Sequence, residues 1–376
     1  MRFIRSFFLF IISVVIVSPV QAQSLQISVT NQTNDHGPTV FQLGDQSVLL
    51  RENVVKYLGS DRQFSGFLSY GISPDITTLG MLQRSFENSP ALVLDQRADT
   101  LAAYSPSGME ASDPSLAIYP FSNGQSIIRQ NIGRFAFYNA LGKRQAIYSS
   151  VTGSEGGESI SKLASDLAGQ TVVLYNPKIV LNGGEGSRAH ITQSNGNLMT
   201  FFSSSDRLIE SLKVTANGQF IGLLTVKEGT NRALLVYDRF GNQLSSMQFE
   251  DAIQDFTLSE SAQTLLVYSE QRALAYDLIS GEKLGSTSFR SNVVHADYFS
   301  SDHLIIALTG RPNPSGKRLN NVQVHAIHLE KREITSKEWS GTLGLHPKLT
   351  PGFTRKTPNT YLLKGTSKQL NIKANF

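Results

Sequence analysis

The clearest pattern of apolar and polar positions lies between Asp255 and Arg290, where short apolar runs alternate with polar residues. Ser, Glu, Gln and Gly gather between the runs, as is typical of turns. Each run is too short for a stable helix: Phe256–Leu258, Thr264–Tyr268, Ala273–Leu278 and Leu284–Phe289. The stretch therefore predicts a unit of four short strands joined by tight turns.

This unit recurs along the chain. Gly157–Asn176 aligns without a gap onto Glu250–Ser269, and Leu212–Leu223 aligns onto Phe256–Val267. A step of about 40 to 50 residues is the period of the four-stranded blades of propellers. Four short strands cannot bury both faces of their sheet alone, so such units stack on neighbours. The recurrence predicts an all-β fold of stacked sheets.

A strand followed by a glycine turn also repeats: Leu234–Asp238 with Gly241 matches Leu274–Asp277 with Gly281. On these residues the chain resembles the WD40, YVTN and quinoprotein-like β-propeller superfamily, and the YVTN style in particular. The resemblance implies an all-β β-propeller of about seven four-stranded blades. It is clearest over residues 157–310, within a single domain expected to cover 23–376. No Trp-Asp pair ends a repeat, unlike in a regular WD40 protein. Because this architecture hosts many activities, the resemblance implies a fold and no function.

One candidate third-strand core can be assigned to each unit, which gives seven or eight sheets, and we expect the two ends of the chain to complete one blade together. The candidates are Val48, Leu101, Ala136, Val172, Ile221, Leu265, Ile305 and Leu362. One segment has an alternative: Ile160, Leu163 and Leu167 also fit a helical stripe closed by Gly169. Its gapless match to a strand-like segment favours a strand.

The N-terminus has the three parts of a secretory signal. Arg2 and Arg5 are basic, Phe7–Val17 is apolar, and Val20–Ala22 provides small residues for cleavage. We expect residues 1–22 to be removed and the protein to be secreted, to a periplasm or the extracellular space; the alternative is an uncleaved anchor helix. No later window is long enough to cross a bilayer, so no transmembrane segment is expected after signal removal. The chain has no cysteine, which excludes disulfides and Cys-based zinc sites.

Charge is unevenly distributed. The formal net charge is +4, yet the residues after Gly310 contain twelve Lys and Arg against three Glu. Clustered cations on one surface attract anionic polymers or lipid head groups. The best candidates for such binding flank stretches rich in Pro and Gly: Lys317, Arg318, Arg355 and Lys356. The alternative is an ordinary solvated face. Secretion makes a nucleic acid an unexpected target.

Few residues suggest chemistry. His295 and Asp297 share a face of a predicted strand, and His303 follows in the next turn, so these nitrogen and oxygen atoms are candidate ligands of a divalent metal. The alternative is that they satisfy backbone donors in turns. His325 and His328, three apart on a strand, point to opposite faces and cannot share a metal. We find no motif for a cofactor, so none is expected, and no Gly-x-Ser-x-Gly elbow for a hydrolase.

These observations favour a non-catalytic scaffold that binds a protein partner or an anionic polymer at the cell envelope. The alternative is a propeller hydrolase or lyase acting on an extracellular glycan or peptide. An enzyme should bring charged and His side chains together at one mouth of the central channel. A scaffold should instead present a broad exposed patch on a rim, where a rigid frame holds its loops.

Overall fold

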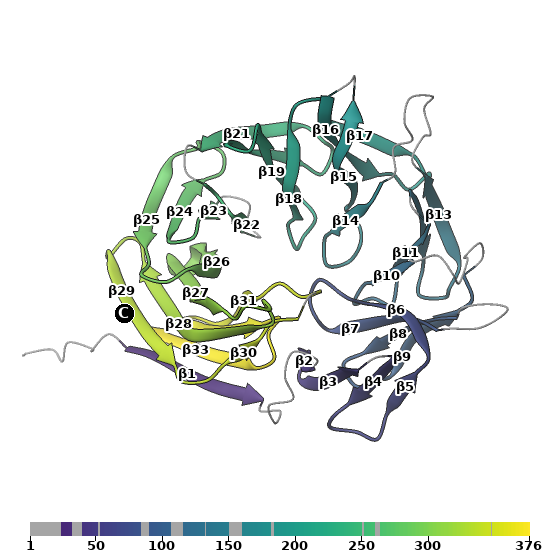
Figure 1. Cartoon of the computed structure of the whole chain (residues 1–376), viewed down its shortest axis with the longest axis horizontal. Coiled ribbons are helices and arrows are strands. Elements are labelled where there is room, and N and C mark those ends of the chain that lie inside the picture. Colours follow the sequence, from purple (N-terminus) through teal and green to yellow (C-terminus); the bar gives the residue numbers. More distant parts are fainter. Residues whose placement is uncertain are drawn as a thin grey trace, which may run out of the picture.

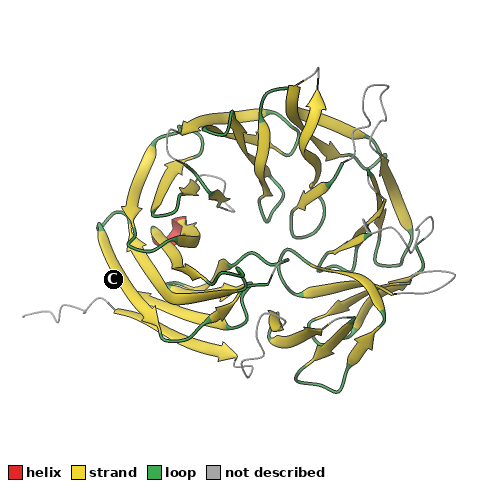
Figure 2. Ribbon diagram, in the orientation of Figure 1, coloured by secondary structure: helices red, strands yellow, loops and turns green. Residues whose placement is uncertain are grey.

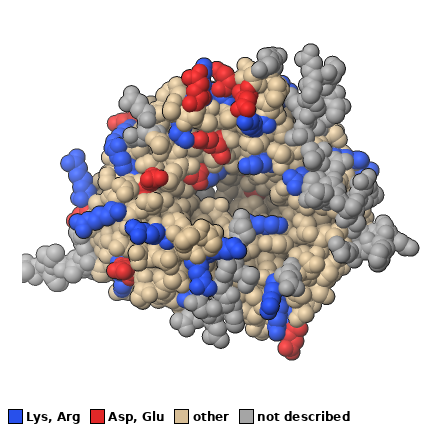
Figure 3. Space-filling model, viewed as in Figure 1, with Lys and Arg blue, Asp and Glu red and all other residues tan. Residues whose placement is uncertain are grey.

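The computed structural model describes residues 24–31, 40–51, 53–83, 90–106, 116–131, 133–149, 160–181, 184–249, 252–259, 264–346 and 348–376. Within them, the strands form eight antiparallel sheets arranged in a ring (Figures 1 and 2), and the space-filling view shows a hollow at the centre of this ring, the central channel (Figure 3). The predicted signal segment 1–22 lies outside the described residues. The protein is therefore an all-β propeller, as the repeats predicted.

The blades are numbered here in chain order, and in each the first strand lies innermost. Blades 1 to 4 consist of β2 (Val40–Leu43), β3 (Gln46–Arg51), β4 (Val54–Tyr57) and β5 (Gln63–Ser65); β6 (Phe67–Ile72), β7 (Thr78–Gln83), β8 (Ala91–Asp95) and β9 (Thr100–Tyr104); β10 (Ala117–Pro120), β11 (Ser126–Asn131), β12 (Arg134–Tyr138) and β13 (Arg144–Ser149); and β14 (Lys162–Ser165), β15 (Val172–Leu181), β16 (Gly184–Thr192) and β17 (Leu198–Ser204).

Blades 5 to 8 follow the same order. They consist of β18 (Leu208–Val214), β19 (Phe220–Lys227), β20 (Asn231–Asp238) and β21 (Gln243–Phe249); β22 (Asp255–Leu258), β23 (Thr264–Tyr268), β24 (Arg272–Asp277) and β25 (Lys283–Ser288); β26 (Val293–Phe299), β27 (Leu304–Pro312), β28 (Arg318–His328) and β29 (Glu333–Trp339), with the short β30 (Leu343–Gly344) paired to β28; and β31 (Gly352–Thr357), β32 (Thr360–Lys364), β33 (Gln369–Asn375) and β1 (Ser24–Asn31).

The two ends of the chain build blade 8 together, as expected from the sequence. β1 pairs antiparallel with β33, with Ser24 opposite Asn375 and Val29 opposite Leu370. The N-terminal strand thus becomes the outermost strand of a blade whose other three strands are C-terminal. This pairing of the two ends of the chain closes the ring and gives blade 8 its fourth strand.

The eight candidate core positions fall one in each blade, so the repeat count was a sound guide to the architecture. Six of the eight lie on the second strand, for example Val172 on β15 and Leu265 on β23, and Leu101 lies on the fourth strand, β9. The prediction of third strands was therefore wrong for these seven and right for Ala136 on β12. The second strand has a hydrogen-bonded neighbour on each side and is covered on both faces, and every residue of β23 is buried. A strand covered in this way reads as a continuous apolar run.

The doubtful segment after Ile160 forms a strand. β14 pairs with β15 through Leu163 and Leu174, in the register that the alignment with β22 and β23 predicted. The described residues contain one helical turn, the three-residue 3-10 helix η1 (Ser300–Asp302).

The hydrophobic core is divided into clusters that lie between neighbouring blades. One cluster joins blades 5 and 6 through Leu224, Val236, Phe256 and Val267. Similar clusters join the other neighbouring pairs from blade 1 to blade 8. Burying one face of a blade therefore requires the next blade, which is why the sequence repeats as a ring.

Candidate functional site

The innermost strands of blades 5 to 8 enclose a cavity of about 740 Å³ beside the central channel. It is lined by the ends of β18, β22, β26 and β31, and Figure 3 shows the molecule hollowed near the centre of the ring, with charged side chains around the hollow. Three residues singled out in the sequence line this cavity: His295, Asp297 and Arg355. The cavity is the place where the predicted chemistry concentrates.

A carboxylate on the first strand of blade 6 binds the neighbouring blade. The ammonium of Lys213 on β18 donates to Oδ2 of Asp255 at 2.5 Å, and the hydroxyl of Ser211 donates to Oδ1 at 3.0 Å. The hydroxyl of Tyr268 donates to the same carboxylate at 3.2 Å. Both oxygens of Asp255 are thus engaged by residues of blades 5 and 6.

A second carboxylate continues the chain into blades 7 and 8. Nε2 of His295 lies 2.8 Å from Oδ2 of Asp297, and the backbone N–H of Phe353 donates to the same oxygen at 2.8 Å. Burial by itself would raise the pKa of Asp297, but the hydrogen bond and charge of His295, with the Phe353 amide, lower it below its ordinary value. Asp297 is therefore ionised at neutral pH.

Tyr268 links the two carboxylates. Its hydroxyl lies 3.4 Å from Nδ1 of His295 in addition to its bond with Asp255. Burial, and next the negative charges of Asp255 and Asp297, raise the pKa of the Tyr268 phenol, so it stays protonated. The result is a polar chain that runs from Lys213 to Phe353 and joins four consecutive blades. Its bonds hold neighbouring blades together.

The sequence predicted only part of this chain. His295 and Asp297 were found because both lie on β26, two residues apart. Lys213 was missed because its partner Asp255 lies on another blade. Tyr268 and Asp255 were missed because they lie on neighbouring strands of blade 6, 13 residues apart in the sequence. Tyr268 carried a usable signal, since a tyrosine at the end of a buried apolar run needs a partner for its hydroxyl.

The third candidate metal ligand lies elsewhere. Nδ1 of His303 is 3.2 Å from the carboxylate of Glu330, and its ring stacks on His328 with centroids 6.5 Å apart. Within the described part of the chain, no three His, Asp or Glu side chains are arranged to hold a metal ion. The structure thus pairs His295 with Asp297 and gives His303 a different partner.

The four candidate cations of the basic end have different surroundings. Arg355 makes a two-pronged ion pair with Asp302, with both N–O distances 2.7 Å, and Tyr361 donates to the same carboxylate at 2.6 Å. Lys317 lies in the exposed turn before β28, and Arg318 and Lys356 are exposed on strands β28 and β31. Arg355 therefore ties blade 8 to blade 7, whereas the other three face solvent.

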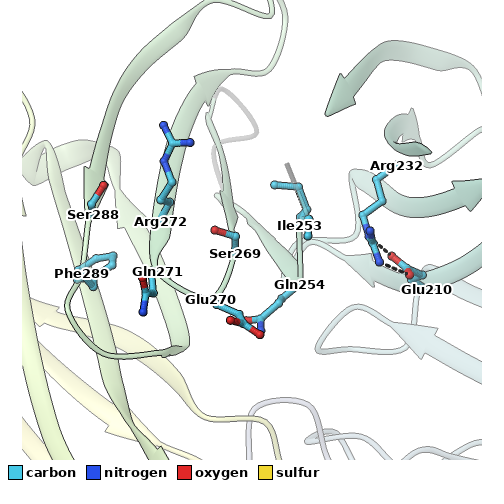
Figure 4. Close-up of a pocket in the computed structure, with 11 residues that line it drawn as sticks. Glu210, Arg232, Ile253, Gln254, Ser269, Glu270, Gln271, Arg272, Ser288 and Phe289 are labelled. Carbon is cyan, nitrogen blue, oxygen red and sulfur yellow. Dashed lines mark hydrogen bonds and ion pairs between the residues drawn. The ribbon is translucent and has the colours of Figure 1, made fainter. Parts of the chain in front are cut away.

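A second cavity, of about 840 Å³, lies between blades 5 and 6 (Figure 4). On one side Arg232 binds Glu210 through two hydrogen bonds of 2.8 and 2.9 Å. Its other walls are the link before blade 6 and the turn between β23 and β24, which contains Glu270 and Gln271. In an antiparallel blade this turn lies at the opposite end from the first turn, and the first turns of blades 5 to 7 border the channel cavity.

Comparison with known proteins shows the fold of this chain and no family. No family model and no curated protein sequence matches the chain. Among solved structures, the Dos1 propeller matches with a TM-score of 0.58 and 10% identity over 93% of this chain and 95% of that one. BamB from Moraxella catarrhalis matches with a TM-score of 0.51 and 13% identity over 93% of this chain and all of the other (100%). These likenesses agree with the β-propeller resemblance found in the sequence.

The outer rim carries exposed apolar residues at equivalent positions of several blades. In the turn between the third and fourth strands, Leu141, Phe240 and Ile279 are 91%, 62% and 78% exposed. Each lies two residues after an Asn or Asp whose side chain accepts its backbone N–H, at 2.9 to 3.0 Å. This turn chemistry leaves the side chain pointing outward.

The fourth strands continue the pattern. The second residue of β21, β25 and β29 is Leu244, Leu284 or Ile334, and all three are exposed. In two places a turn of this kind packs on the fourth strand of the blade before it. A Cβ at Gly241 would lie 2.8 Å from Phe201 of blade 4, and one at Gly285 would lie 2.8 Å from Leu329 of blade 7. Blades 5 to 7 thus carry five exposed apolar residues near the start of their fourth strands, which we name the apolar band: Phe240, Leu244, Ile279, Leu284 and Ile334.

Proposed function

We propose that the protein is a non-catalytic scaffold that binds an apolar segment of a partner protein along the apolar band. Single exposed apolar residues are common on monomers. Here they occupy two matching positions on blades 5 and 6, and the band continues to Ile334 on blade 7. An elongated patch of this kind suits an extended chain better than a small molecule. The band is the observation that carries the proposal.

The channel cavity supports a scaffold over a hydrolase or lyase. Among the residues that line this cavity, Lys213 is bonded to Asp255 and His295 is bonded to Asp297. A catalytic acid or base must reach the proton that it transfers, within about 2.6 to 3.2 Å of the substrate atom. In this arrangement the same groups hold blades together.

We propose further that the scaffold is exported and works as one propeller domain over residues 23–376. The first described strand, β1, starts at Ser24, immediately after the predicted signal and its cleavage site. Removal of residues 1–22 would leave β1 whole to close blade 8. Among the described residues there is no helix of the length and hydropathy needed to span a bilayer.

Site-specific photo-crosslinking tests the binding surface. A crosslinking amino acid placed at Phe240, Ile279 or Ile334 in the full chain should give the same discrete product with one protein of the native cell envelope. The same label at Leu141 is the matched control, because it occupies the equivalent turn of blade 3 and is more exposed than the band residues but lies outside the band. The product should disappear in Phe240→Ser/Ile279→Ser.

This test requires that the double variant folds normally. Its circular dichroism spectrum and melting temperature should match those of the parent, because exposed positions contribute little to stability. Identical products from Leu141 and from the band would contradict the proposal. So would a product that persists in the double variant.

A further inference from the structure

The channel cavity contains a carboxylate oxygen that the described residues leave open. Both hydrogen bonds to Asp297, from Nε2 of His295 and from the N–H of Phe353, end on Oδ2. Among the described residues none donates to Oδ1, and this atom is not sealed from solvent, because the side chain is 20% exposed and lines the cavity. A carboxylate taken partly out of water is stabilised by donors on its oxygens. Oδ1 is therefore a place for a donor of a ligand.

The charged groups of the cavity already face opposite charges. The ammonium of Lys213 pairs with Asp255 at 2.5 Å. Arg355 pairs with Asp302 through Nε and Nη2, both at 2.7 Å. The imidazole bonded to Oδ2 of Asp297 places its charge beside that carboxylate. A ligand with a net charge would add an unmatched charge and lose its own hydration, so the cavity favours a neutral ligand.

Several hydroxyl groups and one further donor face the same space. Ser301 in η1, Thr350 before β31 and Thr354 on β31 are exposed and line the cavity. Arg355 lines it too, and its bonds to Asp302 use Nε and Nη2, which leaves Nη1 for another acceptor. A hydroxyl both donates and accepts hydrogen bonds. A ligand with several hydroxyl groups of its own can therefore satisfy this mixture of donors and acceptors.

The lining also provides apolar surface and open space. Val214 at the end of β18 and Leu258 at the end of β22 line the cavity and are partly exposed. Apart from the neighbours of Gly352 in the chain, the nearest described atom to a Cβ added at this residue is Nε2 of His295, 4.0 Å away. The backbone of β31 thus borders open space next to the bonded pair of His295 and Asp297. The volume of about 740 Å³ is usual for a small-molecule site.

We propose that the channel cavity binds a neutral sugar, which combines hydroxyl groups with an apolar face of C–H groups. One sugar hydroxyl donates to Oδ1 of Asp297, in a charge-assisted hydrogen bond that is stronger than one between neutral groups. Other hydroxyls bond to the Ser and Thr hydroxyls and to Nη1 of Arg355, and the C–H groups lie against Val214 and Leu258. This site is independent of the apolar band and of the partner proposed for it.

Calorimetric titration of the intact protein with glucose, galactose and mannose tests the site. At least one of these sugars should bind at millimolar concentration or below. Gly352→Val should abolish that binding, because the added side chain fills the open space without removing a bond of the polar chain. Ser286→Val is the matched control, because it adds an apolar side chain at an exposed position of the outer strand β25 and should leave binding unchanged.

A second variant keeps the test valid if Gly352→Val folds poorly. Asp297→Asn keeps the shape of the side chain and removes its charge, so it should weaken binding by roughly ten-fold, as expected for a hydrogen bond to a charged group. Circular dichroism of each variant should match that of the parent. Sugar affinity that is the same in Gly352→Val and the parent would overturn the proposal, as would the failure of all three sugars to bind.

Two charged probes test the preference for a neutral ligand. The amino and uronic-acid forms of the sugar that binds have the same ring with a positive or a negative charge. Each should bind more weakly than the neutral sugar, because its charge finds no unmatched partner in the cavity. Tighter binding of either charged form would overturn the assignment to a neutral sugar. The crosslinks expected from the apolar band do not depend on any of these results.

Discussion

At the scale of single residues, two histidines are buried in the neutral form. Nε2 of His325 lies 2.9 Å from the hydroxyl of Thr309, and Nδ1 lies 2.7 Å from that of Ser336. A neutral imidazole has one donor and one acceptor, which two hydroxyls can match. Burial lowers the pKa of His325 to about 4, and burial with the charge of Lys348 lowers that of His346 to about 4. Both rings are thus structural groups that resist protonation.

Their burial predicts a loss of stability in mild acid. Because the folded pKa lies below the ordinary value of about 6.5, the unfolded chain binds these protons first, and the unfolding free energy falls as pH decreases from 6.5 towards 4. The full effect is about 3 kcal/mol for each histidine. Urea unfolding at pH 7.5 and pH 5 should show a smaller decrease in His325→Gln than in the parent. The exposed His303→Gln is the control, and an unchanged decrease in His325→Gln would refute the explanation.

At the scale of elements, polar side chains on the strands and in the turns between them join one blade to the next. Asp302 is the clearest case, because its side chain is 6% exposed and accepts from both Arg355 and Tyr361 of blade 8. Burial opposes ionisation of Asp302, but the bonds from Arg355 and Tyr361 lower its pKa below the ordinary value. The carboxylate therefore holds blades 7 and 8 together in its charged form.

Removing that charge should weaken the junction. Asp302→Asn is expected to lower the unfolding free energy by roughly 2 to 3 kcal/mol, the range for hydrogen bonds to a buried charged group. Asp206→Asn offers a matched control, because Asp206 pairs with Lys227 at 2.8 Å but both side chains are largely exposed. Its loss should be much smaller, since surface ion pairs are screened by water. Equal losses in the two variants, measured by urea unfolding, would refute the role of Asp302.

The elements also show what the sequence could and could not predict. Strand positions and register followed from apolar runs that recur at a fixed step, and the gapless match of 157–176 to 250–269 holds in β14, β15, β22 and β23. Hydrogen-bond partners that lie on different blades could not be predicted from these runs. Lys213 and Asp255 are 42 residues apart, and which strand ends meet depends on how far each blade turns against the next. His295 and Asp297 could be paired in advance because alternation along one strand places them on the same face.

At the scale of the whole molecule, the ring has one junction built differently from the others. Apolar clusters join each neighbouring pair from blade 1 to blade 8, but among the described residues no such cluster joins blade 8 back to blade 1. That junction is crossed by Gln369, whose side-chain amide donates to the carbonyl of Gly44, and by the segment of His346 and Leu349. The closing seam therefore depends on a few contacts.

This seam should open before the rest of the ring. Local opening is easiest where few buried apolar contacts must be broken, so amide hydrogen exchange measured by mass spectrometry should be faster in β2 and β3 than in β19 and β20. Leu349→Ala, which removes the apolar anchor of the crossing segment, should speed exchange in β2 and β3 specifically. Leu258→Ala is the matched control, because Leu258 is also partly buried but packs between blades 5 and 6. If both variants raise amide exchange evenly around the ring, the seam between blades 8 and 1 is as stable as the other junctions. The prediction that this seam opens first would then be wrong.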